Sequence, residues 1–397
     1  MSAGTLQICL VSQEFPPYTN WGGIAVYTGE LAAAYAARGH EVTVVSRASP
    51  GAPARETYRG ANVLRVGSPI TRKRLTGRTI DRLLHARAVR TAVDRLHAAR
   101  PLDVIETTEA GLEADRLVRR DELRTRLVIQ CNGSNAFGEA AGGLLAPLHR
   151  ADWAWSFRHE QIVLRAVPVI IATSEATRAV LTGQGLPAAR IALIPQGIDT
   201  RRFSPDRRLP RAGPLRVGFV GRLEQRKGID FIWKIVERLA PTGRFEFHLK
   251  GAIHPASRAN TLARLARFKG TVTHHPPGSH DDMPSFYRGI DVLLQPSRFE
   301  NFGLAYAEAM ASGVLVLAGR RGGGSEIVTD GVNGFLVDPD GPIDRAVEIL
   351  ERAAARDGVY AAITAAGRDE IMRRFALDRC ADRKLELYAS LAGRRQA

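Results

Sequence analysis

The feature that most constrains the fold is an alternation, along nearly the whole chain, between short apolar runs and longer amphipathic segments. The first block has strand-like runs at Gln7–Ser12, Glu41–Ser46 and Leu127–Gln130, with helical spacing between them, for example at Ala25–Arg38. Strands that alternate with helices predict a parallel sheet covered by helices on both faces. A second block of the same kind begins at Arg216–Val220. We therefore predict an α/β chain of two Rossmann-like, doubly wound parallel-sheet domains.

The length of the chain, 397 residues, also favours two domains, because one hydrophobic core rarely extends over so many residues. The stretch Gly197–Pro214 carries three prolines and many charges but little periodicity, which is typical of a linker. We predict a first domain over 1–195, a linker over 196–212 and a second domain over 213–372. Doubly wound domains bind ligands at the carboxyl ends of their strands, so two facing domains would hold a ligand in a cleft between them.

The formal net charge of +15 predicts an anionic partner: a phosphate-bearing ligand, a membrane surface or nucleic acid. No apolar run reaches the roughly 18–20 residues needed to cross a bilayer, and the N-terminus lacks the pattern of a secretion signal. Cys9, Cys131 and Cys380 show no metal-ligand spacing, and the first two fall in apparent strands as small buried thiols. These features predict a protein of the reducing cytoplasm.

A basic segment over 72–100 carries nine basic and two acidic residues, with Ile80, Leu83 and Leu84 in its apolar stripe. A basic amphipathic helix can lie on the anionic inner face of a membrane or offer a landing site to an acceptor phosphate. It can equally be a surface helix that packs through its apolar face and leaves its arginines in solvent. Both interpretations, peripheral membrane contact and ordinary packing, stay open.

Two glutamates, Glu300 and Glu308, bracket a predicted helix start. The apolar run Ile290–Gln295 is typical of a buried strand, and helical spacing begins at about Phe302, so Glu300 falls on a loop and Glu308 in the second helical turn. A helix start offers N–H groups and a positive dipole end, and Gly303 allows a ligand close to the backbone. This is a phosphate site, and carboxylates beside it accept hydrogen bonds from hydroxyls. The segment predicts a sugar nucleotide or sugar phosphate as ligand.

The run from Glu300 to Gly313 resembles the E-x(7)-E signature of the retaining family-4 glycosyltransferases of GT-B architecture. Further segments resemble other motifs of this family, in the family's order. They are Glu14–Pro17 with Gly22–Ala25 (first glycine loop), Ile194–Asp199 (inter-domain hinge), Gly221–Gly228 (diphosphate loop) and Gly323–Val328 (late glycine turn). In this family the last helix, here over 373–397, returns to the first domain.

The resemblance implies a second domain that binds a nucleoside-diphosphate sugar, and a first domain on the acceptor side. Arg222 and Lys227 lie in one strand-to-helix loop, where two cations can hold a diphosphate and stabilise it as it leaves. The family pattern assigns Glu308 to the ribose hydroxyls and Glu300, with the two cations, to the reacting donor sugar. The remaining donor contacts are implied at Gly22 and Gly23 and at the backbone N–H groups of Phe302, Gly303 and Leu304.

The clearest departure from the family pattern is Asn132. Many members have His-Gly after the corresponding strand, whereas this chain has Cys131-Asn132-Gly133. The family histidine supports the donor sugar. An asparagine can donate a hydrogen bond but cannot carry a charge. We therefore expect Asn132 to contact the donor sugar without transferring a proton, and the departure leaves the identity of that sugar open.

We predict a retaining glycosyltransferase that moves a sugar from a nucleoside-diphosphate sugar to a hydroxyl acceptor, with no metal, no cofactor and no nucleic-acid partner. His274, His275 and His280 match no known ligand spacing, and we expect a loop near the nucleobase pocket there. No dinucleotide-binding glycine pattern follows the first strand, which argues against an oxidoreductase. Two alternatives stay open. One is a nucleotide-sugar epimerase or hydrolase of GT-B fold, and the other is a non-enzymatic basic protein that binds polyanions or membrane surfaces.

Overall fold

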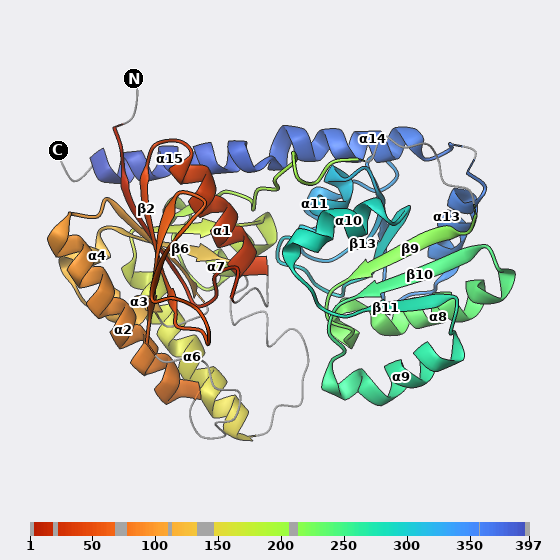
Figure 1. The fold of residues 1–397 in the computed structure, drawn as a ribbon, viewed down its shortest axis with the longest axis horizontal. Coiled ribbons are helices and arrows are strands. Elements are labelled where there is room, and N and C mark those ends of the chain that lie inside the picture. Colours follow the sequence, from red (N-terminus) through yellow and green to blue (C-terminus); the bar gives the residue numbers. More distant parts are fainter. Residues whose placement is uncertain are drawn as a thin grey trace. The chain divides into compact units, whose positions relative to one another are not determined.

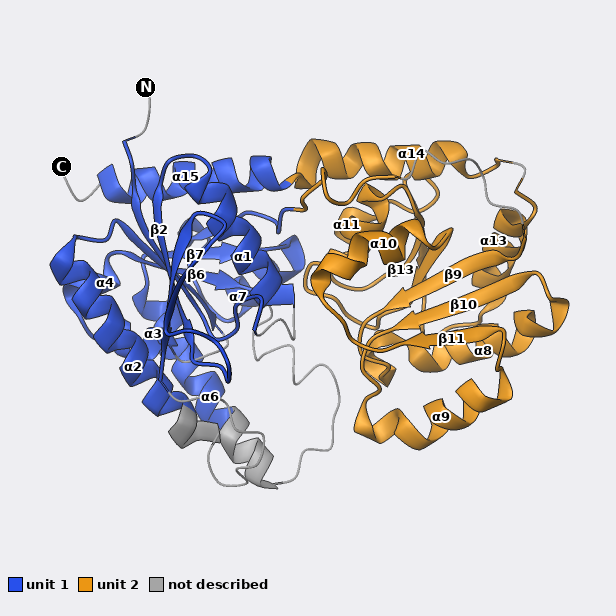
Figure 2. Ribbon diagram, in the orientation of Figure 1, with its two compact units in different colours: residues 1–197, 377–397 blue, residues 198–376 orange. Residues whose placement is uncertain are grey.

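The computed structural model describes residues 4–18, 23–67, 78–109, 113–132, 147–205, 213–356 and 358–393. The chain divides into two compact units, which Figure 2 shows in different colours. Unit 1 comprises Met1–Gly197 and Leu377–Ala397, and unit 2 comprises Ile198–Ala376. The predicted cleft between two domains stays a prediction, because the positions of the units relative to one another are not determined.

Unit 1 is built on one large sheet. Its strands are β1 (Gln7–Ser12), β2 (Glu41–Arg47), β3 (Arg55–Tyr58), β4 (Ala61–Val66), β5 (Val104–Thr108), β6 (Leu127–Cys131), β7 (Val169–Ala172) and β8 (Ile191–Leu193). Within the described residues their order is β3-β4-β2-β1-β5-β6-β7-β8, and every neighbouring pair except β3 and β4 is parallel. The order reverses between β1 and β5, so the loops that follow these two strands leave the sheet side by side.

Helices cover both faces of this sheet (Figure 1). They are α1 (Gly23–Ala36), α2 (Arg78–Ala99), α3 (Glu113–Leu117), α4 (Asp121–Arg124), α6 (Pro147–Ala166), α7 (Glu175–Gly183) and α15 (Leu377–Gly393). Successive side chains of a strand point to opposite faces. In β1, Ile8 and Leu10 therefore join the core under α1 and the C-terminal helix α15, whereas Cys9 and Val11 join the core under α2, α6 and α7.

The strand β3 was not expected from the sequence. It pairs antiparallel with β4 at the edge of the sheet, through a two-residue turn in which Arg59 and Gly60 have φ of 48° and 90°. Such a left-handed turn suits the twist of a hairpin. The strand residues Arg55-Glu56-Thr57-Tyr58 are mostly polar and alternate between exposed and half-buried, because an edge strand needs little apolar surface. The strand therefore has no apolar run from which it could be predicted.

The helix α2 is present, but its predicted apolar stripe is partly wrong. Leu84 is 58% exposed, whereas Val89 and Val93 are fully buried in the core that α2 shares with α3. The buried face of α2 therefore includes Val89 and Val93, beside the predicted stripe. Residues 72–77 lie outside the described part of the chain, and contact of this segment with a membrane stays a prediction. None of the described helices is long and apolar enough to cross a membrane.

Unit 2 repeats the architecture with a smaller sheet. Its strands are β9 (Leu215–Val220), β10 (Phe245–Lys250), β11 (Val272–His275), β12 (Val292–Gln295), β13 (Leu315–Gly319) and β14 (Phe335–Val337). Its helices are α8 (Ile229–Leu239), α9 (Arg258–Arg267), α10 (Met283–Arg288), α11 (Leu304–Ala311), α12 (Gly324–Ile327), α13 (Asp344–Ala354) and α14 (Ala361–Glu370). All strand pairs among the described residues of unit 2 are parallel. The strand β12 shows the two layers: Val292 and Leu294 pack with α8 and α13, and Leu293 packs with α10 and α11.

The predicted linker over 196–212 is not wholly separate from the units. Ile198 and Phe203 are buried in the core of unit 2, and the Ile198 N–H donates to Phe375 O at 2.8 Å. Residues 206–212 lie outside the described part of the chain. The helix α15 belongs to unit 1, where it packs against α1 through residues such as Tyr388.

Candidate active site

The strand order of unit 2 brings two distant loops together. Numbered from 1 to 6 along the chain, its strands run 3-2-1-4-5-6 across the sheet, so β9 and β12 are direct neighbours. The loops that follow them, residues 221–228 and 296–303, leave the sheet where the strand order reverses. Doubly wound sheets bind ligands in the crevice at this switch point. Arg222, Lys227 and Glu300 all lie on these two loops.

Glycine lets these loops pack closely. Gly228 has φ of 77°, and a Cβ atom there would lie only 2.1 Å from Pro296 O. Gly303 has φ of 99° and forms the N-cap of α11, where no side chain caps the helix. The predicted helix start at Phe302 is therefore two residues early. The Phe302 ring is buried against Phe375, with ring centroids 5.6 Å apart, so only the Phe302 backbone can meet a ligand.

Lys227 and Glu300 form an ion pair that joins the two loops. Lys227 Nζ lies 2.5 Å from Glu300 Oε1, and Ser297 Oγ donates to the same oxygen at 2.7 Å. Burial raises the pKa of Glu300, but Lys227 and Ser297 outweigh it and hold this pKa below its ordinary value. Glu300 is therefore an ionised, oriented carboxylate. The sequence marked both charges but not their contact, because they stand 73 positions apart.

Arg222 stands at the carboxyl end of β9 with its side chain 58% exposed. It forms an ion pair with Glu224 in the same loop, with Arg222 Nη2 3.3 Å from Glu224 Oε1. A surface ion pair of this kind is weak, so the guanidinium can exchange it for a phosphate at little cost. Of the three cations in this loop, Lys227 is anchored by Glu300, Arg226 pairs with Glu224, and Arg222 is the most exposed.

Glu308 lies in the second turn of α11, as predicted, and is 7% exposed. One carboxylate oxygen is 2.8 Å from His280 Nε2, and the other accepts a hydrogen bond from Tyr287 Oη at 2.8 Å. These two side chains fix the carboxylate and leave lone pairs for hydroxyl donors. The sequence did not reveal Tyr287 as a support, because its contact with Glu308 arises only when α10 packs beside α11.

The late glycine turn supports Glu300 from the other side. The Gly323 N–H donates to Glu300 O at 2.7 Å, and Glu300 pairs with Gly322 as an isolated bridge. A Cβ atom at Gly322 would lie 2.1 Å from Glu300 O. The backbone of Glu300 is thus held by a turn that only glycine can form at this distance.

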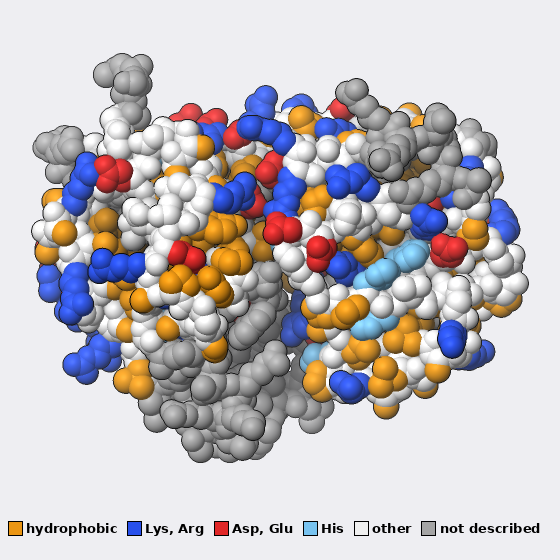
Figure 3. All heavy atoms as spheres, viewed as in Figure 1, with side chains coloured by type: hydrophobic (Ala, Val, Ile, Leu, Met, Phe, Trp, Pro, Cys, Tyr) orange, Lys and Arg blue, Asp and Glu red, His pale blue; other side chains and the backbone are white. Residues whose placement is uncertain are grey.

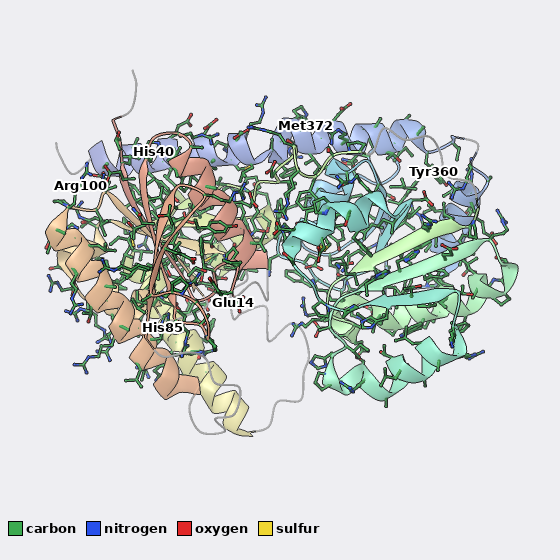
Figure 4. All side chains as sticks on the ribbon, viewed as in Figure 1. Glu14, His40, His85, Arg100, Tyr360 and Met372 are labelled. Atoms are coloured by element: carbon green, nitrogen blue, oxygen red, sulfur yellow. The ribbon has the colours of Figure 1, made fainter. Side chains whose placement is uncertain are left out.

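The residues of unit 1 that the sequence predicts as donor contacts lie in a loop and at a strand end. Figure 4 labels Glu14 in the loop that follows β1 and leads toward α1. Gly23 is the first residue of α1, and Gly22 lies outside the described residues. The predicted contact of the Gly23 N–H with phosphate stays a prediction.

Asn132 directly follows β6 and is buried, with 9% exposure. Its N–H donates to Glu109 Oε1 at 2.9 Å. Its side-chain oxygen Oδ1 accepts from Gln130 Nε2 at 2.7 Å and from Gln196 Nε2 at 2.8 Å. Within the described part of the chain, the buried Asn132 Nδ2 has no hydrogen-bond partner. The carboxamide is therefore oriented as a hydrogen-bond donor.

The predicted loop at His274 and His275 is wrong, because both residues belong to β11, an edge strand. The strand has one apolar residue followed by three polar ones, so the sequence shows no apolar run there. His275 Nε2 and His248 Nδ1 are 3.1 Å apart, and pale-blue histidines gather on one face of unit 2 in Figure 3. Burial lowers the pKa of both rings, which favours their neutral forms. The described residues contain no cluster of three or more side chains suited to a metal ion.

Comparison with known families agrees with this arrangement. The family described as "Glycosyltransferase Family 4" matches residues 21–202, and "Glycosyl transferases group 1" matches residues 201–370. The chain belongs to glycosyltransferase family 4. Among its family-4 relatives, D-inositol 3-phosphate glycosyltransferase of Xylanimonas cellulosilytica is 31% identical, over 95% of this chain and 93% of the relative. The protein of the same name from an Arthrobacter species is 30% identical, over 85% and 83% of the two chains.

Solved structures show that this family-4 glycosyltransferase has the GT-B fold. Sucrose-phosphate synthase of Thermosynechococcus elongatus matches 97% of this chain and 99% of its own, with a TM-score of 0.82 at 23% identity. Anabaena HepE in complex with UDP-glucose matches 96% and 99% of the two chains, with a TM-score of 0.72 at 20% identity. At these sequence identities the solved structures establish the fold alone. The chemistry of the site is inferred from the side chains described above.

Proposed function

We propose that this glycosyltransferase transfers a sugar from a nucleoside-diphosphate sugar to a hydroxyl acceptor, with retention at the anomeric carbon and without a metal. The observation that carries the proposal is the Lys227–Glu300 contact at the switch point of unit 2, beside the uncapped start of α11. One cation, one carboxylate and a row of helix N–H groups there match a phosphate attached to a sugar.

Each group has one role in this proposal. Arg222 and Lys227 bind the diphosphate and stabilise the negative charge that develops on it as it leaves. Glu308 accepts hydrogen bonds from the ribose hydroxyls, and Glu300 accepts them from the donor sugar. The N–H groups at Gly303 and Leu304 bind the sugar or the distal phosphate. Two side-chain cations supply the charge that a divalent ion supplies in other transferases.

Retention follows from attack on the face from which the diphosphate departs, with a leaving phosphate oxygen taking the acceptor's proton. This route needs no enzymic nucleophile. It suits Glu300, because Lys227 and Ser297 already engage its Oε1 and hold the carboxylate as an ionised hydrogen-bond acceptor. Catalysis then consists mainly of aligning two substrates and stabilising the leaving group.

Fewer observations bear on the acceptor substrate than on the donor. The relatives named D-inositol 3-phosphate glycosyltransferases and the net charge of +15 support an anionic polyol, such as an inositol phosphate, as the first acceptor to test. Structures of HepE with UDP and with UDP-glucose support a uridine nucleotide as the first donor to test.

The test incubates the purified chain with labelled nucleotide sugars and D-inositol 3-phosphate in the presence of a chelator, and follows the anomeric protons by NMR. The proposal predicts that an α-configured donor gives an α-linked product and that the chelator leaves the rate unchanged. Label that appears only as free sugar would indicate a hydrolase, and an epimerised nucleotide sugar would indicate an epimerase. A β-linked product would contradict retention.

A further inference from the structure

A fully buried lysine lies inside unit 1, in the C-terminal helix α15. Lys384 is 0% exposed, and its ammonium nitrogen lies 2.8 Å and 2.9 Å from the two carboxylate oxygens of Glu106 in β5. It also donates to Gln130 Oε1 in β6. An ammonium group has three N–H donors, and here three oxygens accept them. Burial lowers the pKa of Lys384, and Glu106 opposes this shift.

Lys384 determines how two neighbouring side-chain carboxamides, those of Gln130 and Asn132, are oriented. A charged ammonium can only donate, so the Gln130 carboxamide must turn its oxygen toward Lys384 and its NH2 group away. That NH2 group donates to Asn132 Oδ1 at 2.7 Å, so Asn132 in turn must point its oxygen at Gln130. Asn132 Nδ2 is then the end of the chain, and it has no partner in the described residues.

A second side chain supports the same orientation of the Asn132 carboxamide. Gln196 Nε2 donates to the same Asn132 oxygen at 2.8 Å. A flipped Asn132 carboxamide would face two NH2 groups with its own NH2 group. Because a buried donor without a partner is costly, the free NH2 group calls for an acceptor supplied from outside this network.

We propose that Lys384 is a positioning residue for the donor sugar: through Gln130 it fixes the Asn132 carboxamide with its NH2 group presented to the sugar. This inference rests on the proposed function. It also constrains the substrate class. The group of the sugar that meets Asn132 must accept a hydrogen bond, as a hydroxyl, an acyl carbonyl or a carboxylate does. An amino sugar with an ammonium group at that place is disfavoured, because two donors would face each other.

The test is a double-mutant cycle between Gln130→Met and Asn132→Ala, which leaves the Lys384–Glu106 pair in place. In the wild-type background, Gln130→Met should lower kcat/KM for the preferred nucleotide sugar by roughly 3- to 10-fold, the range expected for one neutral hydrogen bond. It should leave the Kd of the free nucleoside diphosphate within about twofold. In the Asn132→Ala background, Gln130→Met should have no further effect on kcat/KM, because the group that it orients is gone.

Two further variants separate positioning from general packing. The double variant Glu106→Gln/Lys384→Met removes the buried charges together and should reproduce the loss seen with Gln130→Met. Tyr388→Phe is the matched control, because the Tyr388 hydroxyl donates to Glu106 and not to the Gln130 carboxamide among the described hydrogen bonds, and the variant should leave donor use unchanged. Circular dichroism and thermal unfolding confirm that each variant is folded.

The outcomes are distinct. Full additivity of Gln130→Met and Asn132→Ala, or an equal loss of kcat/KM in Tyr388→Phe, would overturn the positioning role. Unchanged donor use in Asn132→Ala, in an enzyme that does transfer sugar, would overturn it while leaving the proposed function intact. Absence of transfer from any nucleotide sugar by the wild-type chain would remove the proposed function and this inference together.

Discussion

Two glutamate–lysine pairs in this molecule use the same chemistry for different ends. The pair of Glu300 and Lys227 lies on loops at the carboxyl ends of the strands of unit 2, with its side chains 14% and 18% exposed. The pair of Glu106 and Lys384 lies inside unit 1, with its side chains 9% and 0% exposed. Lys384 directs all three ammonium N–H groups at protein oxygens, whereas Lys227 Nζ has one acceptor among the described residues.

The two pairs carry the same charges. They differ in how many of the lysine N–H donors already have a protein acceptor, and this number distinguishes the structural pair from the ligand-binding one. A buried pair with every donor used has no capacity left for a ligand, and breaking it leaves a charge stranded in the protein. A pair with unused donors at a strand end keeps that capacity, and a diphosphate can supply the missing acceptors. The following predictions test or sharpen this comparison.

The largest expected effect is on stability. Lys384→Met should lower the free energy of unfolding by about 3–5 kcal/mol, because it leaves the Glu106 carboxylate buried without its cation. Lys227→Met should lower the free energy of unfolding clearly less, because Glu300 keeps its hydrogen bond from Ser297 and some access to water. Urea unfolding followed by circular dichroism measures both. Equal losses in the two variants would show that the pairs do not differ as described.

The next effect is on turnover. Arg222→Ala and Lys227→Ala should each lower kcat by roughly 10²-fold, or about 3 kcal/mol of lost stabilisation of the leaving diphosphate. Lys234→Ala is a suitable control, because Lys234 is an exposed lysine of α8, the helix that follows this loop. A steady-state transfer assay gives the three rates. Near-wild-type turnover in both loop variants would remove the diphosphate role from this loop.

A smaller effect distinguishes the two glutamates of the switch point. Glu308→Ala should weaken binding of free nucleoside diphosphate by about tenfold, because a carboxylate that accepts ribose hydrogen bonds is lost. Glu300→Ala should chiefly impair use of the intact donor and change nucleotide affinity little. Calorimetry on both variants decides between these roles. Loss of nucleotide affinity in Glu300→Ala alone would reverse the assignment.

The smallest effect is a pH dependence. The pKa of Glu300 is held below the ordinary carboxyl value of 4.5, so folding favours its ionised form. Its stabilising contribution is therefore fully present above pH 4.5 and is lost as the pH falls through the lowered value. The stability difference between wild type and Glu300→Gln should be constant from pH 5 to 8 and shrink at lower pH. A difference that begins to shrink near pH 6 would contradict a lowered pKa.

The sequence predicted much of the fold because its signals are local. The bounds of β1 and the placement of Glu300 on a loop and Glu308 in the second helical turn follow from apolar spacing alone. The edge strands β3 and β11 were missed because these two strands carry few apolar residues. Local patterns identify an element best where the element is buried on both sides.

The partners of the site residues could not be predicted in the same way. Lys227 meets Glu300 because β9 and β12 become neighbours in the sheet, and Lys384 meets Glu106 across 278 positions of sequence. Neither contact can be predicted from the local spacing of residues, because the partners are far apart in the sequence. Family motifs marked Arg222, Lys227, Glu300 and Glu308 as charges, and only the packed structure shows which of their atoms are already engaged.

The most direct test of the account is calorimetric titration of a nucleoside diphosphate, UDP first, into wild type, Lys227→Met and the double variant Glu106→Gln/Lys384→Met. The account predicts that Lys227→Met loses at least tenfold in affinity, because a diphosphate ligand loses its anchored cation. The double variant should bind within about twofold of wild type, because its buried pair holds the fold and does not touch the nucleotide. Unchanged affinity in Lys227→Met, or an equal loss in both variants, would contradict the account.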